Sequence, residues 1–410
     1  MSSPAANAQN SMLYRILQTM VERQASDVYL SAQAPVTFKI KGLSLPANQQ
    51  SLSDDAPLQL LAELLTPERI EQLQTSGELN LAISLPGLGH FRLSALRQRG
   101  SYAAVIRHVP AHIPPLDTLN LPAILSRLVL DKRGLILIAG ASGAGKSTTL
   151  AAMLDHRNQH LPGHILTIED PIEYVFTNRR SIVNQREVGS DTASFHIGLK
   201  NGLRQAPDVI MIGEIRDRET VAAALAYAHS GHLCLATLHA SNSHQALHRC
   251  TNFFPPEVRP SLLSDLAGAL RAVVSQRLLR STEGGQLPAV EVLLSTPLVA
   301  ELIERGDFLG VKQAMDSTLA EGSQTFEQDL ARLVAEGRID RQEALAQADS
   351  SANLLWRLKN ERAGAASLDV GHVGTLAPSF SGITLEVPAE PDGGVLPAVV
   401  ESRRFRGTPY

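Results

Sequence analysis

The sequence predicts an α/β fold built on a parallel or mostly parallel sheet, and three observations support this. A glycine-rich stretch at residues 140–147 matches the template G-x-x-x-x-G-K-[ST] at every fixed position. An apolar run with strand character, Gly134–Ala139, precedes it, and a good helix-forming stretch, Thr148–Leu154, follows it. Further apolar runs then alternate with helical stretches, which is the pattern of a sheet covered by helices.

The glycine-rich stretch predicts a phosphate-binding loop. Its glycines let backbone N–H groups converge on phosphate oxygens, and the N-terminus of the following helix adds positive potential. We expect Lys146 to neutralise the β- and γ-phosphates of a nucleotide and Ser147 to supply an oxygen to Mg²⁺. The predicted nucleotide-binding residues are Gly140, Ala141, Ser142, Gly143, Ala144, Gly145, Lys146, Ser147 and Thr148.

Composition limits the classes of protein that fit. A chain of 410 residues is long enough for two or three domains, and its hydrophobic content of 44% is ample for their cores. The formal net charge is −4, which argues against a generally basic surface for nucleic acid. We therefore expect no nucleic-acid partner.

Cysteine use and apolar patterning indicate a cytosolic protein. Cys234 and Cys250 form no metal-binding pattern and are interpreted as reduced thiols. Residues 2–10 are polar, so no signal peptide is predicted. The longest apolar stretch, residues 121–140, is interrupted by Asp-Lys-Arg at 131–133, so no membrane span is predicted either. Any attachment to a membrane would then depend on a partner.

Residues 1–109 predict a small α/β domain. Apolar residues from Met12 to Val21 follow helical spacing, and later runs alternate as strands do. Strands are predicted at 27–30, 36–40, 79–83, 91–95 and 103–107, and helices at 58–65 and from 66 onward. The proline-dense segment that follows predicts a linker at 110–118, because proline stops both helices and strands.

A second domain is predicted at 119–362. Beyond the phosphate-binding loop, strands are predicted at 164–168, 209–212 and 232–238, a helix at 219–229, and several helices from 297 to about 359. After residue 363 glycine and proline become frequent, so residues 363–410 are predicted to be a disordered tail.

Polar side chains follow the predicted strands at the points where they end. Glu169 and Glu173 come after the first of these strands, Glu214 after the second, and His239 after the third. Ligands in open α/β sheets lie beyond the carboxyl ends of the strands, so these groups are candidates for orienting water and holding Mg²⁺. Taken singly, each glutamate also fits a helix cap or a surface charge, and His239 also fits a hydrogen-bonded residue at a strand end.

Four segments resemble, in chain order, the Walker A, Asp, Walker B and His boxes of the secretion and type IV pilus ATPase superfamily. They are residues 140–148, 167–174, 208–214 and 231–239. Segments at 185–191, 203–209, 238–246 and 252–255 resemble the retraction ATPases of the PilT and PilU branch, and the last two are closer to the PilU type. The resemblance covers residues from about 12 to 360.

The resemblance implies a RecA-like P-loop ATPase domain that follows a smaller PAS-like N-terminal domain. It implies ATP and Mg²⁺ as cofactors and a hexameric ring in which N-terminal arginines act at a neighbour's nucleotide. Arg92 and Arg107 are the first candidates for that role, ahead of Arg97 and Arg99. The resemblance makes Glu169 or Glu173 the water-orienting base and Glu214 the acid near Mg²⁺, and the His box supplies His239 and His232.

The resemblance also implies a function. It is pilus retraction by pilin disassembly in twitching motility, as an accessory to a principal retraction ATPase. The implied partners are an inner-membrane platform protein and other motor subunits, in a homo-hexamer or a mixed ring. The resemblance places this ring at the cytoplasmic face of the inner membrane.

Three alternative functions are an ATP-binding adaptor with little turnover, an extension or type II secretion ATPase, and a DNA-translocating motor. Extension motors commonly carry a four-cysteine metal site and extra N-terminal modules, which this sequence lacks, and the net charge of −4 disfavours a DNA channel.

Overall fold

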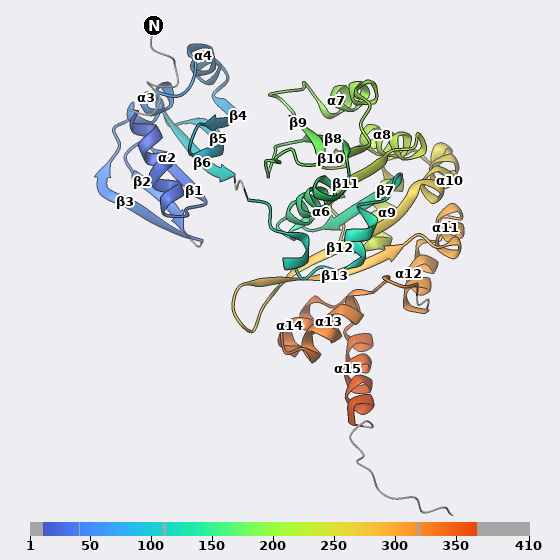
Figure 1. Cartoon of the computed structure of the whole chain (residues 1–410). Coiled ribbons are helices and arrows are strands. Elements are labelled where there is room, and N and C mark those ends of the chain that lie inside the picture. Colours follow the sequence, from blue (N-terminus) through green and yellow to red (C-terminus); the bar gives the residue numbers. More distant parts are fainter. Residues whose placement is uncertain (1–10, 41, 110–111, 318–319, 367–410) are drawn as a thin grey trace, which may run out of the picture. The chain divides into compact units, whose positions relative to one another are not determined.

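The computed structural model describes residues 11–40, 42–109, 112–317 and 320–366, and its strands form two sheets (Figure 1). The predicted tail lies outside the described residues, apart from residues 363–366, which end the last helix. The other predicted domain boundaries stay predictions. Within the described ranges, no helix combines the length and the apolar character needed to cross a bilayer.

The first sheet is antiparallel, with strand order β3-β2-β1-β6-β5-β4. Its core joins apolar faces of three helices to the strands, through buried side chains such as Leu13, Leu61 and Phe91. The elements are α2 (Met12–Glu22), β1 (Asp27–Ser31), β2 (Pro35–Ile40), β3 (Leu43–Ser51), α3 (Ala56–Ala62), α4 (Pro67–Ser76), β4 (Glu78–Leu85), β5 (Gly89–Gln98) and β6 (Ser101–Val109).

The second sheet has the order β13-β12-β7-β11-β10-β8-β9 and is parallel except for the β12–β13 pair. This confirms the predicted, mostly parallel sheet. Its elements are η1 (Leu116–Thr118), α5 (Ile124–Leu128), β7 (Gly134–Gly140), α6 (Lys146–His160), β8 (Gly163–Glu169), β9 (Ser181–Glu187), α7 (Phe195–Gly202), η2 (Leu203–Gln205), β10 (Val209–Ile212), α8 (Arg218–His229), β11 (Leu233–Leu238), α9 (Ser243–Asn252), η3 (Pro256–Val258), α10 (Arg259–Ala269), β12 (Leu270–Arg280) and β13 (Gln286–Leu294).

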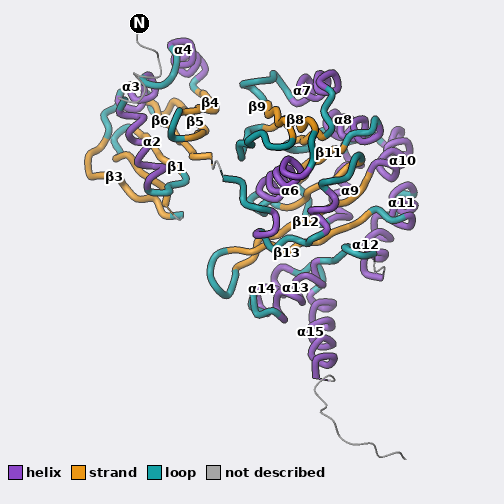
Figure 2. The backbone as a smooth tube through the Cα atoms, viewed as in Figure 1, coloured by secondary structure: helices purple, strands orange, loops and turns teal. Residues whose placement is uncertain are grey.

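Helices cover both faces of the second sheet (Figure 2). Alternate side chains of a strand point to opposite faces, and β7 shows both environments. Leu135 and Leu137 belong to the cluster formed with α8, α9 and α10, whereas Ile136 and Ile138 pack in the cluster that contains α6. The fully buried central strand therefore fixes where α6 begins, and with it the loop between them.

Five helices close the described part of the chain (Figure 1). Apolar side chains of α13, α14 and α15 pack on the ends of β12 and β13, through residues that include Leu279, Leu287, Phe326 and Leu354. The helices are α11 (Pro297–Glu304), α12 (Phe308–Ser317), α13 (Phe326–Ala335), α14 (Arg341–Gln347) and α15 (Ser351–Ala366). The C-terminal helices are thus anchored to the strand that borders β7.

Candidate nucleotide site

The carboxyl ends of β7, β8, β10 and β11 meet at one edge of the second sheet, because these strands are parallel neighbours. A cavity of about 650 Å³ opens at this edge. Its lining includes the predicted side chains Lys146, Glu169, Glu173, Glu214 and His239. The structure therefore brings these groups together from four separate stretches of chain.

The glycine-rich loop joins β7 to α6 and uses backbone conformations that suit glycine. Gly145 has a φ of 85°, and a Cβ there would stand 2.7 Å from the side-chain nitrogen of Gln276. Gln276 also accepts a hydrogen bond from the buried hydroxyl of Thr149 at 2.7 Å. Since α6 begins at Lys146, its first backbone N–H groups remain available beside the loop. The loop thus offers the donors and the helix dipole that suit a phosphate group.

Lys146 is buried within this loop. Its ammonium group donates to the backbone oxygens of Gly140 at 2.9 Å and Ala141 at 2.8 Å. Burial lowers the pKa of Lys146, while the charges of Glu214 and Glu173 oppose that shift. The carbonyl oxygens therefore hold the ammonium where an incoming phosphate group can replace them as its partner.

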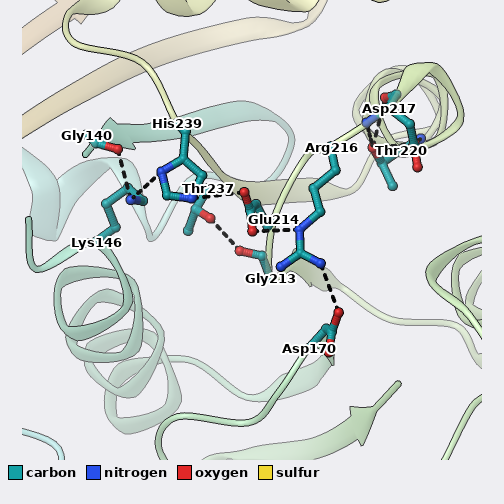
Figure 3. A network of polar contacts seen from close by, with 10 residues as sticks. All are labelled: Gly140, Lys146, Asp170, Gly213, Glu214, Arg216, Asp217, Thr220, Thr237 and His239. Atoms are coloured by element: carbon teal, nitrogen blue, oxygen red, sulfur yellow. Dashed lines mark hydrogen bonds and ion pairs between the residues drawn. The ribbon is translucent and has the colours of Figure 1, made fainter. Parts of the chain in front are cut away.

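Glu214 lies at the centre of a polar network that crosses the cavity (Figure 3). One carboxylate oxygen lies 3.0 Å from His239 Nε2, and the other accepts from Arg216 at 2.7 Å. Arg216 also pairs with Asp170 at 2.9 Å, and His239 Nδ1 lies 3.4 Å from Lys146 Nζ. An ammonium group can only donate, so Nδ1 accepts and the imidazole proton sits on Nε2, facing Glu214.

The two Asp-box glutamates occupy different environments. Glu169 is buried and accepts hydrogen bonds from Thr167 at 2.6 Å and from Gln185 at 3.1 Å. Burial raises the pKa of Glu169, and these hydrogen bonds oppose the shift. Glu173 is exposed and lines the cavity, and nearby Tyr174 lies 2.8 Å from the hydroxyl of Thr148.

Arg92 and Arg107 face each other across the β5–β6 pair. Arg107 lines the cavity, and its guanidinium pairs with Asp27 at 2.7 Å. Arg92 donates to the backbone oxygens of residues 171 and 172 at 3.2 and 2.6 Å, and burial lowers its pKa. Arg97 and Arg99 are exposed and do not line the cavity.

His232 is not brought to this site. It lies before the first residue of β11, whereas His239 follows the last one, so the six-residue strand separates them by roughly 20 Å. The ring of His232 instead contacts Tyr227 and the hydroxyl of Ser230. The predicted strand at 232–238 already placed His232 at the opposite end from His239, and only the resemblance to the His box made it a candidate.

Three residues that sequence reasoning did not single out belong to the site: Asp27, Arg216 and Gln276. Asp27 is buried beneath Arg107, and Gln276 packs against the phosphate-binding loop from β12. Only Arg216 left a signal in the sequence, since it stands two residues after Glu214 and so shares its side of an extended segment. The other two depend on tertiary neighbours.

Comparison with known proteins identifies the family. A family model described as "Type II/IV secretion system protein" matches residues 5–346. The chain belongs to this family. Relatives of this chain, described below, are named ATPases, and the chain is an ATPase.

The individual relatives agree with the predicted resemblance to retraction ATPases, which is thereby confirmed. The chain is 43% identical to the type IV pilus ATPase PilU of Pseudomonas aeruginosa over 96% of this chain and 99% of that protein. It is 35% identical to PilT of the same organism, over 82% of this chain and 98% of PilT. A crystal structure of the pilus retraction motor PilT with bound ADP superposes with a TM-score of 0.78 at 37% identity, covering 83% of this chain and 97% of that one. This likeness also confirms the predicted fold class.

Proposed function

We propose that the chain is an ATP-driven motor that retracts type IV pili by pilin disassembly and so supports twitching motility. The observation that carries this proposal is the 43% identity to PilU over 99% of PilU's length, together with a complete set of nucleotide-handling side chains around one cavity. By contrast, the chain covers only 54% of the type II secretion protein E of Klebsiella pneumoniae, at 32% identity. This difference in coverage favours retraction over secretion or pilus extension.

The proposed chemistry assigns each side chain a task. The loop and Lys146 grip the β- and γ-phosphates, and Glu214, held by His239 and Arg216, is the acid near Mg²⁺. Of the two Asp-box carboxylates, the exposed Glu173 is free to assist at the γ-phosphate, whereas Glu169 is committed to Thr167 and Gln185 and supports the strand end. An arginine can contribute about 10³–10⁵ in rate at a γ-phosphate, and Arg107 and Arg92 are assigned this role.

Mg²⁺ fits the donors at the cavity. Ser147 and Glu214 both line it and supply the hydroxyl and carboxylate oxygens that this cation prefers. In the described parts of the chain, no cluster of three or more His, Cys, Asp or Glu side chains forms a metal site by itself. When bound, the cation would neutralise charge on the β- and γ-phosphates, which supply further oxygen ligands themselves.

We further propose a ring of six subunits, either identical or mixed with a principal retraction ATPase that this chain assists. Such a ring would work at the cytoplasmic face of the inner membrane, where a platform protein of the pilus recruits it. The support is the relationship to PilU and PilT. ATP turnover would then open and close the cavity and turn each subunit against the pilus base.

Two measurements test the proposed function. Deleting the gene in its host and counting surface pili should give normal or excess piliation with loss of surface spreading. Cells without pili would contradict retraction.

The second measurement is steady-state phosphate release by the purified chain, which distinguishes a motor from an adaptor. We expect Glu214→Gln to lower turnover by about a hundredfold or more, as loss of a transition-state interaction does. Equal, near-background rates for both proteins would identify an adaptor instead.

A further inference from the structure

Outside the cavity, Arg277 on β12 joins several segments of the chain. Its guanidinium donates to the backbone oxygen of Gln347 and, at 3.1 Å, to that of Ser241, and it pairs with the carboxylate of Asp349. The same group lies 3.9 Å from the ring centre of Phe326. Gln347 ends α14, Asp349 precedes α15 and Phe326 begins α13, so one side chain links the sheet to the C-terminal helices.

Asp349 extends this link to the segment that carries His239. Its second oxygen accepts from the side chain of Asn242 at 2.7 Å, and Asn242 caps α9 by accepting from the N–H of Gln245 at 3.1 Å. Burial alone would raise the pKa of Asp349, but the hydrogen bonds and charge of Arg277, together with Asn242, outweigh it and lower that pKa. The side chains of Arg277 and Asp349 are only 18% and 14% exposed, so water screens their attraction weakly.

The segment 239–242 is short and is held at both ends. At its start, His239 pairs with Glu214 at 3.0 Å, and its carbonyl accepts from Arg249 at 2.8 Å. Just beyond its end, the N–H of Ser243 donates to the buried carboxyl of Glu291 at 2.6 Å. Arg277 and Asp349 bind the segment between these points. Arg277 and Asp349 are therefore the side chains that hold the middle and end of the segment, two and three residues after His239.

We propose that Arg277 and Asp349 are positioning residues for the hydrolysis reaction, which fix the segment 239–242 and thereby hold His239 against Glu214. The proposal rests on the proposed function, because it requires that the cavity hydrolyse ATP. Neither residue lines the cavity. Any influence that they have on the reaction must therefore pass through the segment 239–242. Through the same contacts, the C-terminal helices are connected to His239, which contacts Glu214.

Separate measurements of kcat and KM test this role in the full chain. Arg277→Lys keeps the charge but loses the planar fork that reaches two acceptors at once, and Asp349→Asn keeps the shape but loses the charge. Misplacing a group without removing it can cost about ten- to a hundredfold in rate, so we expect kcat to fall by about that factor. KM should change by less than about twofold, because Lys146 and the loop, which grip the phosphates, are untouched.

A double-mutant cycle with His239→Ala distinguishes positioning from a general loss of structure. If Arg277 acts through His239, adding Arg277→Lys to His239→Ala should lower kcat no further than His239→Ala alone. The matched control is Arg332→Lys, which breaks a similar fork with Asp329 in α13 at 2.7 Å but leaves the segment 239–242 untouched. It should leave kcat within about twofold of wild type, because the two sites share no partner.

Several results would overturn the proposal. They are a wild-type kcat in folded Arg277→Lys and Asp349→Asn, a wild-type kcat in His239→Ala, or effects that multiply in the double variant. If Arg277→Lys fails to fold, the more conservative Asp349→Asn completes the same cycle with His239→Ala. Absence of phosphate release by the wild-type chain would instead contradict the proposed function.

Discussion

At the scale of single residues, the cavity separates its carboxylates by environment. Glu214 is partly exposed and paired on both oxygens, Glu169 is buried among neutral donors, and Glu173 is open to solvent. Sequence reasoning left Glu169 and Glu173 as equal candidates because both follow the same strand. Their surroundings distinguish the two candidates. The carboxyl of Glu169 already accepts hydrogen bonds from Thr167 and Gln185, so it has less freedom to orient water than the exposed carboxyl of Glu173.

This difference predicts opposite outcomes for two matched substitutions. Glu173→Gln should lower kcat for ATP hydrolysis by about 10²- to 10⁴-fold, because a positioned acid–base group is lost. Glu169→Gln should lower kcat by less than about threefold, since burial already favours the neutral form of this side chain. Steady-state phosphate release from both variants is the measurement, and the reverse order of effects would assign the role to Glu169.

The buried carboxyl of Glu291 predicts a pH dependence of stability. Burial raises the pKa of Glu291 from about 4.5 to about 7 in the folded chain; hydrogen bonds from Ser243 and the charge of Arg277 oppose the shift, and Asp349 adds to it. Because the folded pKa is the higher one, the stabilising contribution is complete below about pH 4.5 and is lost as the pH rises through about 7.

Glu291→Gln should therefore flatten the stability curve across that window. Urea unfolding at about pH 5 and about pH 8 should show that the wild type loses up to about 3 kcal/mol more than the variant between the two conditions. Parallel losses in both proteins would show that Glu291 does not titrate differently on folding.

At the scale of elements, the sequence patterns predicted correctly the strands that are buried along their whole length. Strands β7, β10 and β11 are buried at every residue, and their predicted bounds differ from the structure by at most one residue at each end. Four strands were not predicted: β3, β9, β12 and β13. Strand β3 is exposed at nearly all its residues, β9 is polar and lies at the edge of its sheet, and β12, which pairs with β13, follows α10 with no intervening residue. For β9 and β12, pattern analysis lacked the alternation or the preceding turn residue on which it depends.

The loop between β7 and α6 offers a prediction with an internal control. Gly145 and Gly143 have similar φ values of 85° and 77°, so alanine carries similar backbone strain at either position. Only at residue 145 would the new Cβ approach another atom closely, 2.7 Å from Gln276 Nε2, whereas nothing lies within 4 Å at residue 143.

Both alanine variants should lose about 1 kcal/mol through strain, and Gly145→Ala should lose roughly 1–3 kcal/mol more because Gln276 must move. Urea unfolding in the absence of nucleotide measures this difference without involving catalysis. Equal losses would mean that the contact between Gln276 and the loop does not restrain it.

At the scale of the whole molecule, two sheets have separate apolar cores. Leu61 belongs to the cluster around the first sheet and Leu137 to the cluster around the second, and both side chains are fully buried. Removing either side chain should cost about 2–5 kcal/mol. If the predicted domains at 1–109 and 119–362 are independent folding units, calorimetry should show two transitions, and Leu61→Ala should lower only one of them. A single transition lowered equally by Leu61→Ala and Leu137→Ala would contradict the predicted boundaries.

The site shows the same division between what sequence patterns reveal and what they do not. Residues carried by a fixed-spacing motif or by a strand end, such as Lys146, Glu214 and His239, were found because topology places those ends together. Asp27, Gln276 and Asp349 come from β1, β12 and the turn before α15, far from any motif in the chain. Their roles follow from contacts that only the folded chain creates.

Phosphate release by the purified full-length chain, compared with Lys146→Ala, tests most directly whether this cavity hydrolyses ATP. The ammonium of Lys146 sits inside the phosphate-binding loop, so its removal should lower turnover by at least about a hundredfold. The unfolding temperature should change little, which separates loss of chemistry from loss of fold. Turnover that is undiminished in a folded Lys146→Ala chain would contradict the assignment of this cavity as the site of ATP hydrolysis.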